Sequence, residues 1–153
     1  MVDFSPFMRR RARVLAEIED GVLVCASAAP SVRNNDVTYE FRQDSDFYYL
    51  TGFDEPDAVL VLVGGSSPRS VLFLRPRDPV RELWDGERLG VEGAAALGVE
   101  EARPIVELDE SLPRLLVGHS TLFTRFDAEA LVDARLARAL REARREMRRG
   151  ATC

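Results

Sequence analysis

The chain has 153 residues, of which 46% are hydrophobic and 31% are charged, proportions that fit one soluble globular domain. Its formal net charge of −5 disfavours nucleic-acid binding, since such domains are usually basic. The longest apolar runs, such as 58–63, are far shorter than the ~20 residues that cross a bilayer, and no apolar stretch follows the N-terminal arginines as in a signal peptide. We therefore expect a cytoplasmic protein, with a single domain over residues 1–153, that binds neither nucleic acid nor a membrane.

The first part of the chain predicts a helix followed by a buried strand. Ser5 and Pro6 are typical of an N-cap and of the first helical position, so we expect a helix over 7–19 that Gly21 ends as its C′ residue. The apolar positions at helical spacing are Met8, Ala12, Leu15 and Ile18. The apolar run 22–26 then predicts a short buried strand.

The middle of the chain predicts three strands and a short helix. The aromatic-rich stretch 47–51 is typical of a strand, and the runs 58–63 and 70–74 predict a hairpin with a glycine-rich loop. Residues 75–90 show no clear periodicity and are expected to be irregular. A short helix is expected over 91–97.

The last third of the chain predicts alternating strands and helices. The expected elements are a weak strand over 103–106, a helix that Asp109 caps, a strand over 121–124 and a long helix that Asp127 caps, over about 128–149. Residues 150–153 then form a truncated linker. Because a local hairpin is mixed with strand–helix alternation, we expect an α/β fold in which helices flank a mixed β-sheet.

None of the candidate nucleophiles or general bases in the sequence indicates a catalytic site. Cys25 lies in the apolar run 22–26, where a buried cysteine acting as a small hydrophobe is expected in preference to a reactive thiol. The other cysteine is the last residue, Cys153, and the only histidine, His119, lies in an expected turn without an evident acidic partner. No spacing of Cys or His is typical of a metal site.

Carboxylates crowd one third of the chain and could form a divalent-metal site. They are Asp36, Asp44, Asp46, Asp54, Glu55 and Asp57. Since aspartate also caps helices and shapes turns, a structural role is favoured for them. The glycine-rich loop at 64–67 lies between two strands and not before a helix, so a hairpin turn is favoured over a phosphate site.

Two further features are left open. Trp84, the only tryptophan, lies in a charged and irregular stretch, where a binding anchor and a core residue are equally compatible with the sequence. The arginines of the last predicted helix surround it, which indicates a solvated or partner-facing surface.

Three stretches of the chain together resemble the N-terminal domain of aminopeptidase P, also called the creatinase/prolidase N-terminal domain. Residues 41–58 are similar to the family pattern R-Q-x-S-D-F-x-Y-x-T-G-F-x-E-P, residues 82–90 to E-x-W-x-G-x-R-x-G, and residues 70–78 to the strand and turn between them. The resemblance implies a ribonuclease-H-like α/β fold that mediates contacts between subunits. It also implies that Trp84 reaches the active-site cleft of a neighbouring subunit and that Asp36 lies near the mouth of that cleft.

The resemblance places catalysis in a separate C-terminal domain, where two manganese ions activate the water that cleaves the bond before proline. This sequence shows no such ligand set. We therefore expect a non-catalytic accessory or oligomerisation domain without a metal or cofactor of its own, whose partners are further copies of itself or a catalytic metallopeptidase domain. A stand-alone regulatory module and a small carboxylate-metal hydrolase are the alternatives.

Overall fold

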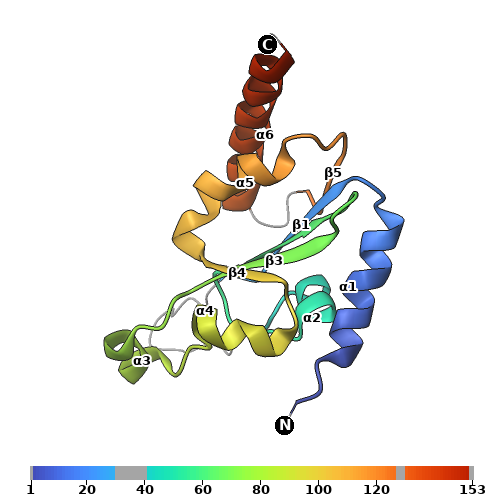
Figure 1. The fold of residues 1–153 in the computed structure, drawn as a ribbon. Helices are drawn as coiled ribbons and strands as arrows, with labels where there is room; N and C mark the ends of the chain where they lie inside the picture. The colour runs from blue at the N-terminus through green and yellow to red at the C-terminus, as the bar shows by residue number, and fades with distance from the viewer. Residues whose placement is uncertain (1, 30–40, 127–129, 152–153) are drawn as a thin grey trace.

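A five-stranded mixed sheet forms the centre of the computed structural model, which describes residues 2–29, 41–126 and 130–151 (Figure 1). The strands are β1 (Val22–Ala26), β2 (Val59–Val63), β3 (Arg69–Leu74), β4 (Glu101–Pro104) and β5 (Leu122–Thr124). Their order in the sheet is β4-β3-β2-β1-β5. Strand β2 is antiparallel to both of its neighbours, whereas β4 is parallel to β3 and β5 is parallel to β1. The expected mixed sheet is confirmed.

Helices cover both faces of this sheet (Figure 1). On one face lie α1 (Ser5–Glu17), α2 (Ser45–Thr51), α4 (Gly90–Gly93) and the 3-10 turn η1 (Ala94–Leu97). On the other face lie α5 (Leu108–Leu116) and α6 (Ala130–Ala151), preceded by the short turn η2 (Ile105–Glu107). One further helix, α3 (Pro79–Asp85), stands away from both layers. Two hydrophobic cores result, one on each side of the sheet.

The central strand β2 is apolar throughout because both of its faces are buried. In β2, Val59, Val61 and Val63 belong to the core under α5 and α6, while Leu60 and Leu62 belong to the core under α1 and α2. All five residues are at most 3% exposed. A run of this kind, bounded by turn residues, is what the sequence pattern predicts for a strand inside a covered sheet.

The prediction of a strand at 47–51 was wrong, because this stretch forms α2. The side chain of Asp44 caps the helix by accepting a hydrogen bond from the amide of Phe47 at 3.0 Å. Phe47 and Leu50 then face the core, whereas Tyr48 and Tyr49 are about half exposed. Burial therefore recurs at helical spacing and does not alternate as in a strand.

The prediction that 75–90 is irregular was also wrong in part, because α3 begins at Pro79 after the cap residue Asp78. Strand β4 ends at Pro104, earlier than the predicted 103–106. The capping residue predicted for α5, Asp109, lies inside that helix, which begins at Leu108 without a side-chain cap.

Both ends of α1 and the end of α6 differ from the predictions. Ser5 is the first residue of α1 and not its cap, and Glu19, not Gly21, adopts the left-handed conformation after the helix, with φ of 55°. Helix α6 continues to Ala151, so the start of the predicted linker is helical. The predicted cap Asp127 and residues 152–153 lie outside the described residues. None of the described helices combines the length and apolar character needed to span a membrane.

Candidate functional site

Helix α3 carries three apolar side chains that contact solvent. Val80 is 70% exposed, Leu83 is 84% exposed and Trp84 is 85% exposed, and no residue of this helix is buried. Figure 1 shows α3 at the far end of a segment that leaves the sheet after β3 and returns at α4. Trp84 is therefore not a core residue, and an exposed indole beside an exposed leucine is typical of a binding surface.

The segment that carries α3, residues 75–89, is called the α3 arm below, and Glu55 anchors both of its ends. The Glu55 carboxylate accepts a hydrogen bond from the amide of Leu89 at 2.9 Å and pairs with the guanidinium of Arg75 at 3.2 Å. Glu55 belongs to the carboxylate-rich part of the sequence, where a metal site was considered. Its observed contacts are with an arginine and a backbone amide, so it serves here to attach the arm to the body of the domain.

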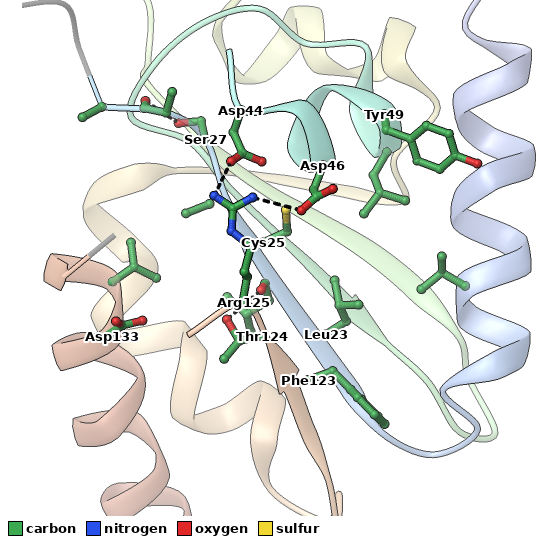
Figure 2. Close-up of a pocket in the computed structure, with 17 residues that line it drawn as sticks. Leu23, Cys25, Ser27, Asp44, Asp46, Tyr49, Phe123, Thr124, Arg125 and Asp133 are labelled. Atoms are coloured by element: carbon green, nitrogen blue, oxygen red, sulfur yellow. Dashed lines mark hydrogen bonds and ion pairs between the residues drawn. The ribbon is translucent and has the colours of Figure 1, made fainter. Parts of the chain in front are cut away.

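A second feature is a groove of about 660 Å³ on the α1–α2 side of the sheet, next to strand β5 (Figure 2). Its apolar lining includes Leu23 and Cys25 of β1, Phe123 of β5, and Leu50 and Tyr49 of α2. Figure 2 shows the polar end of the groove, where side chains of α2 and of the segment after β5 meet above Cys25.

Arg125 joins the two sides of this groove. Its guanidinium lies 3.1 Å from a carboxylate oxygen of Asp46 and 2.9 Å from one of Asp44 (Figure 2). The hydrogen bond to Asp46, followed by the charge of Asp44, raises the pKa of Arg125 above its ordinary value. Two of the carboxylates considered as metal ligands are thus paired with an arginine. Among the described residues, no group of three or more His, Cys, Asp or Glu is placed to hold a metal ion.

Cys25 is expected to be an unreactive thiol. Burial, reinforced by the charges of Asp44 and Asp46 and opposed by Arg125, raises its pKa from 9.0 to about 12. In a Cys153→Ser variant, which leaves Cys25 as the only cysteine, labelling by a disulfide reagent at pH 8 should be about a thousandfold slower in the native protein than in urea, because the thiolate fraction is that much smaller. Rapid labelling of the native variant would contradict this expectation.

His119 lies in a small polar hollow of about 340 Å³ beside the β2–β3 loop. Its Nδ1 atom lies 2.5 Å from the backbone carbonyl of Asp20, which orients the ring without supplying a carboxylate partner. The amides of Gly64 and Gly65 donate to the carbonyls of Gly21 and Glu19, at 2.9 and 2.8 Å. These amides hold the turn after α1, so they are not available to a phosphate, and the predicted hairpin is confirmed.

Of the two site residues that the resemblance indicates, Trp84 lies on the exposed side of α3, and Asp36 lies outside the described residues. Two buried polar residues were missed as structural determinants. Arg11 is 3% exposed and Gln43 is 9% exposed, and each bonds to backbone groups from several elements. The sequence gives a signal for Gln43 alone, which falls in the stretch 41–58 that is similar to the family pattern, and that pattern does not say what its side chain contacts.

The fold and the exposed arm define an α/β domain with a five-stranded mixed sheet that helices cover on both faces. The family model described as aminopeptidase P, N-terminal domain, matches residues 7–123, so the chain belongs to this family. It is 47% identical over 120 residues to a Haemophilus influenzae Xaa-Pro aminopeptidase, with 76% of this chain and 28% of the relative covered. Identity to the Escherichia coli Xaa-Pro aminopeptidase is 39% over 150 residues, with 95% and 34% covered.

Solved structures agree with this assignment. Pseudomonas aeruginosa aminopeptidase PepP superposes with a TM-score of 0.88 at 40% identity, with 97% of this chain and 34% of that chain covered. The low-pH form of E. coli aminopeptidase P superposes with a TM-score of 0.90 at 34% identity, with 98% and 35% covered. The chain therefore spans about a third of the length of the relatives it matches.

Proposed function

We propose that this chain is a non-catalytic accessory domain of an Xaa-Pro aminopeptidase-type protein, which makes contacts between subunits and shapes the access of substrate to a catalytic centre on another domain. The observation that carries the proposal is the α3 arm, which presents Trp84 and Leu83 to solvent, more than four-fifths exposed. Exposing large apolar side chains to water at the end of a projecting segment is unfavourable, so burying them against a partner lowers the free energy.

The partner that we propose is a neighbouring subunit of the same protein, in the cytoplasm. The similarity to Xaa-Pro aminopeptidases supports it, because this chain corresponds to one third of those proteins and the other two thirds offer a place for the catalytic centre. The resemblance to the family supports a position for Trp84 at the active-site cleft of that neighbour. Any dinuclear manganese centre belongs, in this proposal, to the catalytic domain and not to the present chain.

The contact role is tested by self-association of the chain in sedimentation velocity. We expect concentration-dependent association of the native chain and a clear shift toward monomer in Trp84→Ala and Leu83→Ser, because these changes remove the exposed apolar surface. Val106→Ala is the matched control, since Val106 is 82% exposed but belongs to η2 and not to the α3 arm. A native chain that stays monomeric at high concentration would contradict the proposed self-contact.

The access role is tested in a chimera in which this chain replaces the corresponding third of the E. coli Xaa-Pro aminopeptidase. We expect the chimera to cleave Xaa-Pro peptides and the Trp84→Ala change to lower kcat/KM several-fold, mainly through KM, because the indole contacts substrate or the rim of the cleft. Val106→Ala again serves as the control. An unchanged kcat/KM in the Trp84→Ala chimera would show that Trp84 does not affect the access of substrate.

A further inference from the structure

Glu82 lies on α3 between exposed neighbours, yet its carboxylate faces inward. Its side chain is only 7% exposed, whereas the adjacent Leu83 and Trp84 are 84% and 85% exposed. The helix therefore turns its apolar side chains to solvent, whereas Glu82 faces the flanking chain. This arrangement is the reverse of an ordinary amphipathic helix on a protein surface.

The Glu82 carboxylate binds the chain on both sides of α3. One oxygen accepts a hydrogen bond from the amide of Asp78 at 3.0 Å, at the start of the helix. The other accepts from the amide of Arg88 at 2.8 Å and from Nε of Arg77 at 3.1 Å. The chain returns toward Glu82 through Gly86, whose φ of 94° is a conformation that other residues rarely adopt.

Little else is available to hold α3 in place. A helix of seven residues is well below the roughly 12–15 residues at which isolated helices become even marginally stable in water. No residue of α3 is buried, so packing of apolar side chains against the core does not supply the missing stability. Beside the contacts of the Glu82 carboxylate, the Asp78 carboxylate accepts the capping bond from the amide of Arg81 at 3.2 Å and pairs with its guanidinium at 3.9 Å, and the guanidinium of Arg88 donates to the carbonyl of Pro76 at 3.3 Å.

We infer that Glu82 is the positioning residue of the α3 arm: its carboxylate ties the segments before and after α3 together and thereby presents Trp84 and Leu83 in one orientation to the neighbouring subunit. The identity of that partner rests on the proposed function. The positioning of α3 by Glu82 rests on the contacts alone, and it can be tested on the isolated chain.

The arm is expected to respond to acid through Glu82. The hydrogen bond from the Arg88 amide, with further contributions from Arg77 and the amide of Asp78, lowers the pKa of Glu82 below its ordinary value of 4.5, against the opposing effect of desolvation. An acidic group with a lowered pKa stabilises the folded arrangement above its ordinary pKa, and this stabilisation is lost as the pH falls through the lowered pKa. Asp78 within the arm and Glu55 at its base also carry carboxyl groups, so the native protein must be compared with a Glu82 variant.

The experiment is the Glu82→Gln variant of this chain, with Glu87→Gln as the matched control. Glu87 is an exposed glutamate of the same arm for which no side-chain hydrogen bond or ion pair is found among the described residues. Because Trp84 is the only tryptophan, time-resolved fluorescence anisotropy reports on the arm alone. We expect faster local motion of Trp84 and about tenfold faster hydrogen exchange of the amides of α3 in Glu82→Gln, and neither in Glu87→Gln.

A pH titration distinguishes the positioning of α3 by the Glu82 carboxylate from an effect of the substitution on the whole domain. On acidification below pH 4.5, the native anisotropy should fall, whereas in Glu82→Gln most of that fall should already be present at neutral pH. Native-like anisotropy and exchange in Glu82→Gln would overturn the inference, as would a loss of stability of the whole domain in place of a local loosening. If Glu82→Gln loosens the arm but Trp84→Ala leaves association and kcat/KM unchanged, the positioning role stands and the proposed function fails.

Discussion

The Arg11→Ala variant is expected to lose about 3–4 kcal/mol of unfolding free energy and to melt about 10 °C lower, because two buried carbonyls lose a charged donor. The guanidinium of Arg11 is almost fully buried and donates to the carbonyls of Leu50 and Leu97, both at 2.7 Å. These carbonyls lie at the C-terminal ends of α2 and η1, where helical carbonyls lack partners and a cation is favoured. Burial lowers the pKa of Arg11, and the nearby charge of Glu100 opposes that effect.

Thermal and urea unfolding followed by circular dichroism measure this loss. Arg13→Ala is the matched control, since Arg13 is an exposed arginine of the same helix without a side-chain hydrogen bond or ion pair among the described residues. It should change the unfolding free energy by less than about 0.5 kcal/mol. Arg11→Lys should fall between the two, because an ammonium keeps the charge but cannot reach both carbonyls in the fork geometry of a guanidinium. Equal losses for Arg11→Ala and Arg13→Ala would show that the two carbonyls do not depend on Arg11.

Arg11 also shows where the sequence pattern stops being informative. Helical spacing assigns Met8, Ala12, Leu15 and Ile18 to the inner side of the first helix. Ile18, the residue that follows α1, is buried, but Met8 is 47% exposed and Ala12 is also exposed. An arginine is buried instead because it donates to buried carbonyls, and these carbonyls lie 39 and 86 residues away in the chain. Periodicity describes one element at a time, so it cannot reveal that two other elements end where their carbonyls need a donor.

The two helices that were missed have one cause in common. Helices α2 and α3 have seven residues each, which is too short for a helical period to stand out in the sequence, and in α2 the three consecutive aromatic residues at 47–49 also resemble a strand. Strands β1, β2 and β3 could be predicted because they are short, apolar runs bounded by turn residues. Trp84 could be proposed as a site residue only from the motif around it. The role of Glu82 within the same motif becomes visible only when the chain on both sides of α3 is in place.

Gln43→Leu is the second change from which we expect a large loss, about 2–4 kcal/mol of unfolding free energy, although leucine fills a similar volume. The side-chain oxygen of Gln43 accepts hydrogen bonds from the amides of Ala28 at 2.8 Å and Asp44 at 2.9 Å. Its nitrogen donates to the carbonyls of Phe53 at 3.1 Å and Glu55 at 2.9 Å. One amide thus joins the segment after β1, the cap of α2 and the loop that carries Glu55. Leucine would leave four backbone groups without these partners.

Urea unfolding of Gln43→Leu, with Arg42→Ala as the control, measures this effect, since Arg42 is an exposed neighbour without a side-chain hydrogen bond or ion pair among the described residues. A loss no larger than that of Arg42→Ala would contradict the role assigned to the amide. Because the effect is local to the junction of three segments, hydrogen exchange should also rise first at Asp44 and Phe47, at the start of α2.

Gln43→Glu tests the donor half of the amide through its pH dependence. At neutral pH, a carboxylate would turn an oxygen toward the carbonyls of Phe53 and Glu55, so the folded protein should raise the pKa of this glutamate above its unfolded value. A carboxyl group whose pKa is raised in the folded protein destabilises the fold most at pH values above that pKa. This destabilisation decreases as the pH falls through the raised pKa, because the carboxyl group then gains a proton that it can donate. The difference in unfolding free energy between Gln43→Glu and the native chain should therefore shrink between neutral and mildly acidic pH, whereas the difference for Gln43→Leu, which has no proton to gain, should stay constant. A constant difference for both variants would show that the carbonyls of Phe53 and Glu55 do not require a donor at this position.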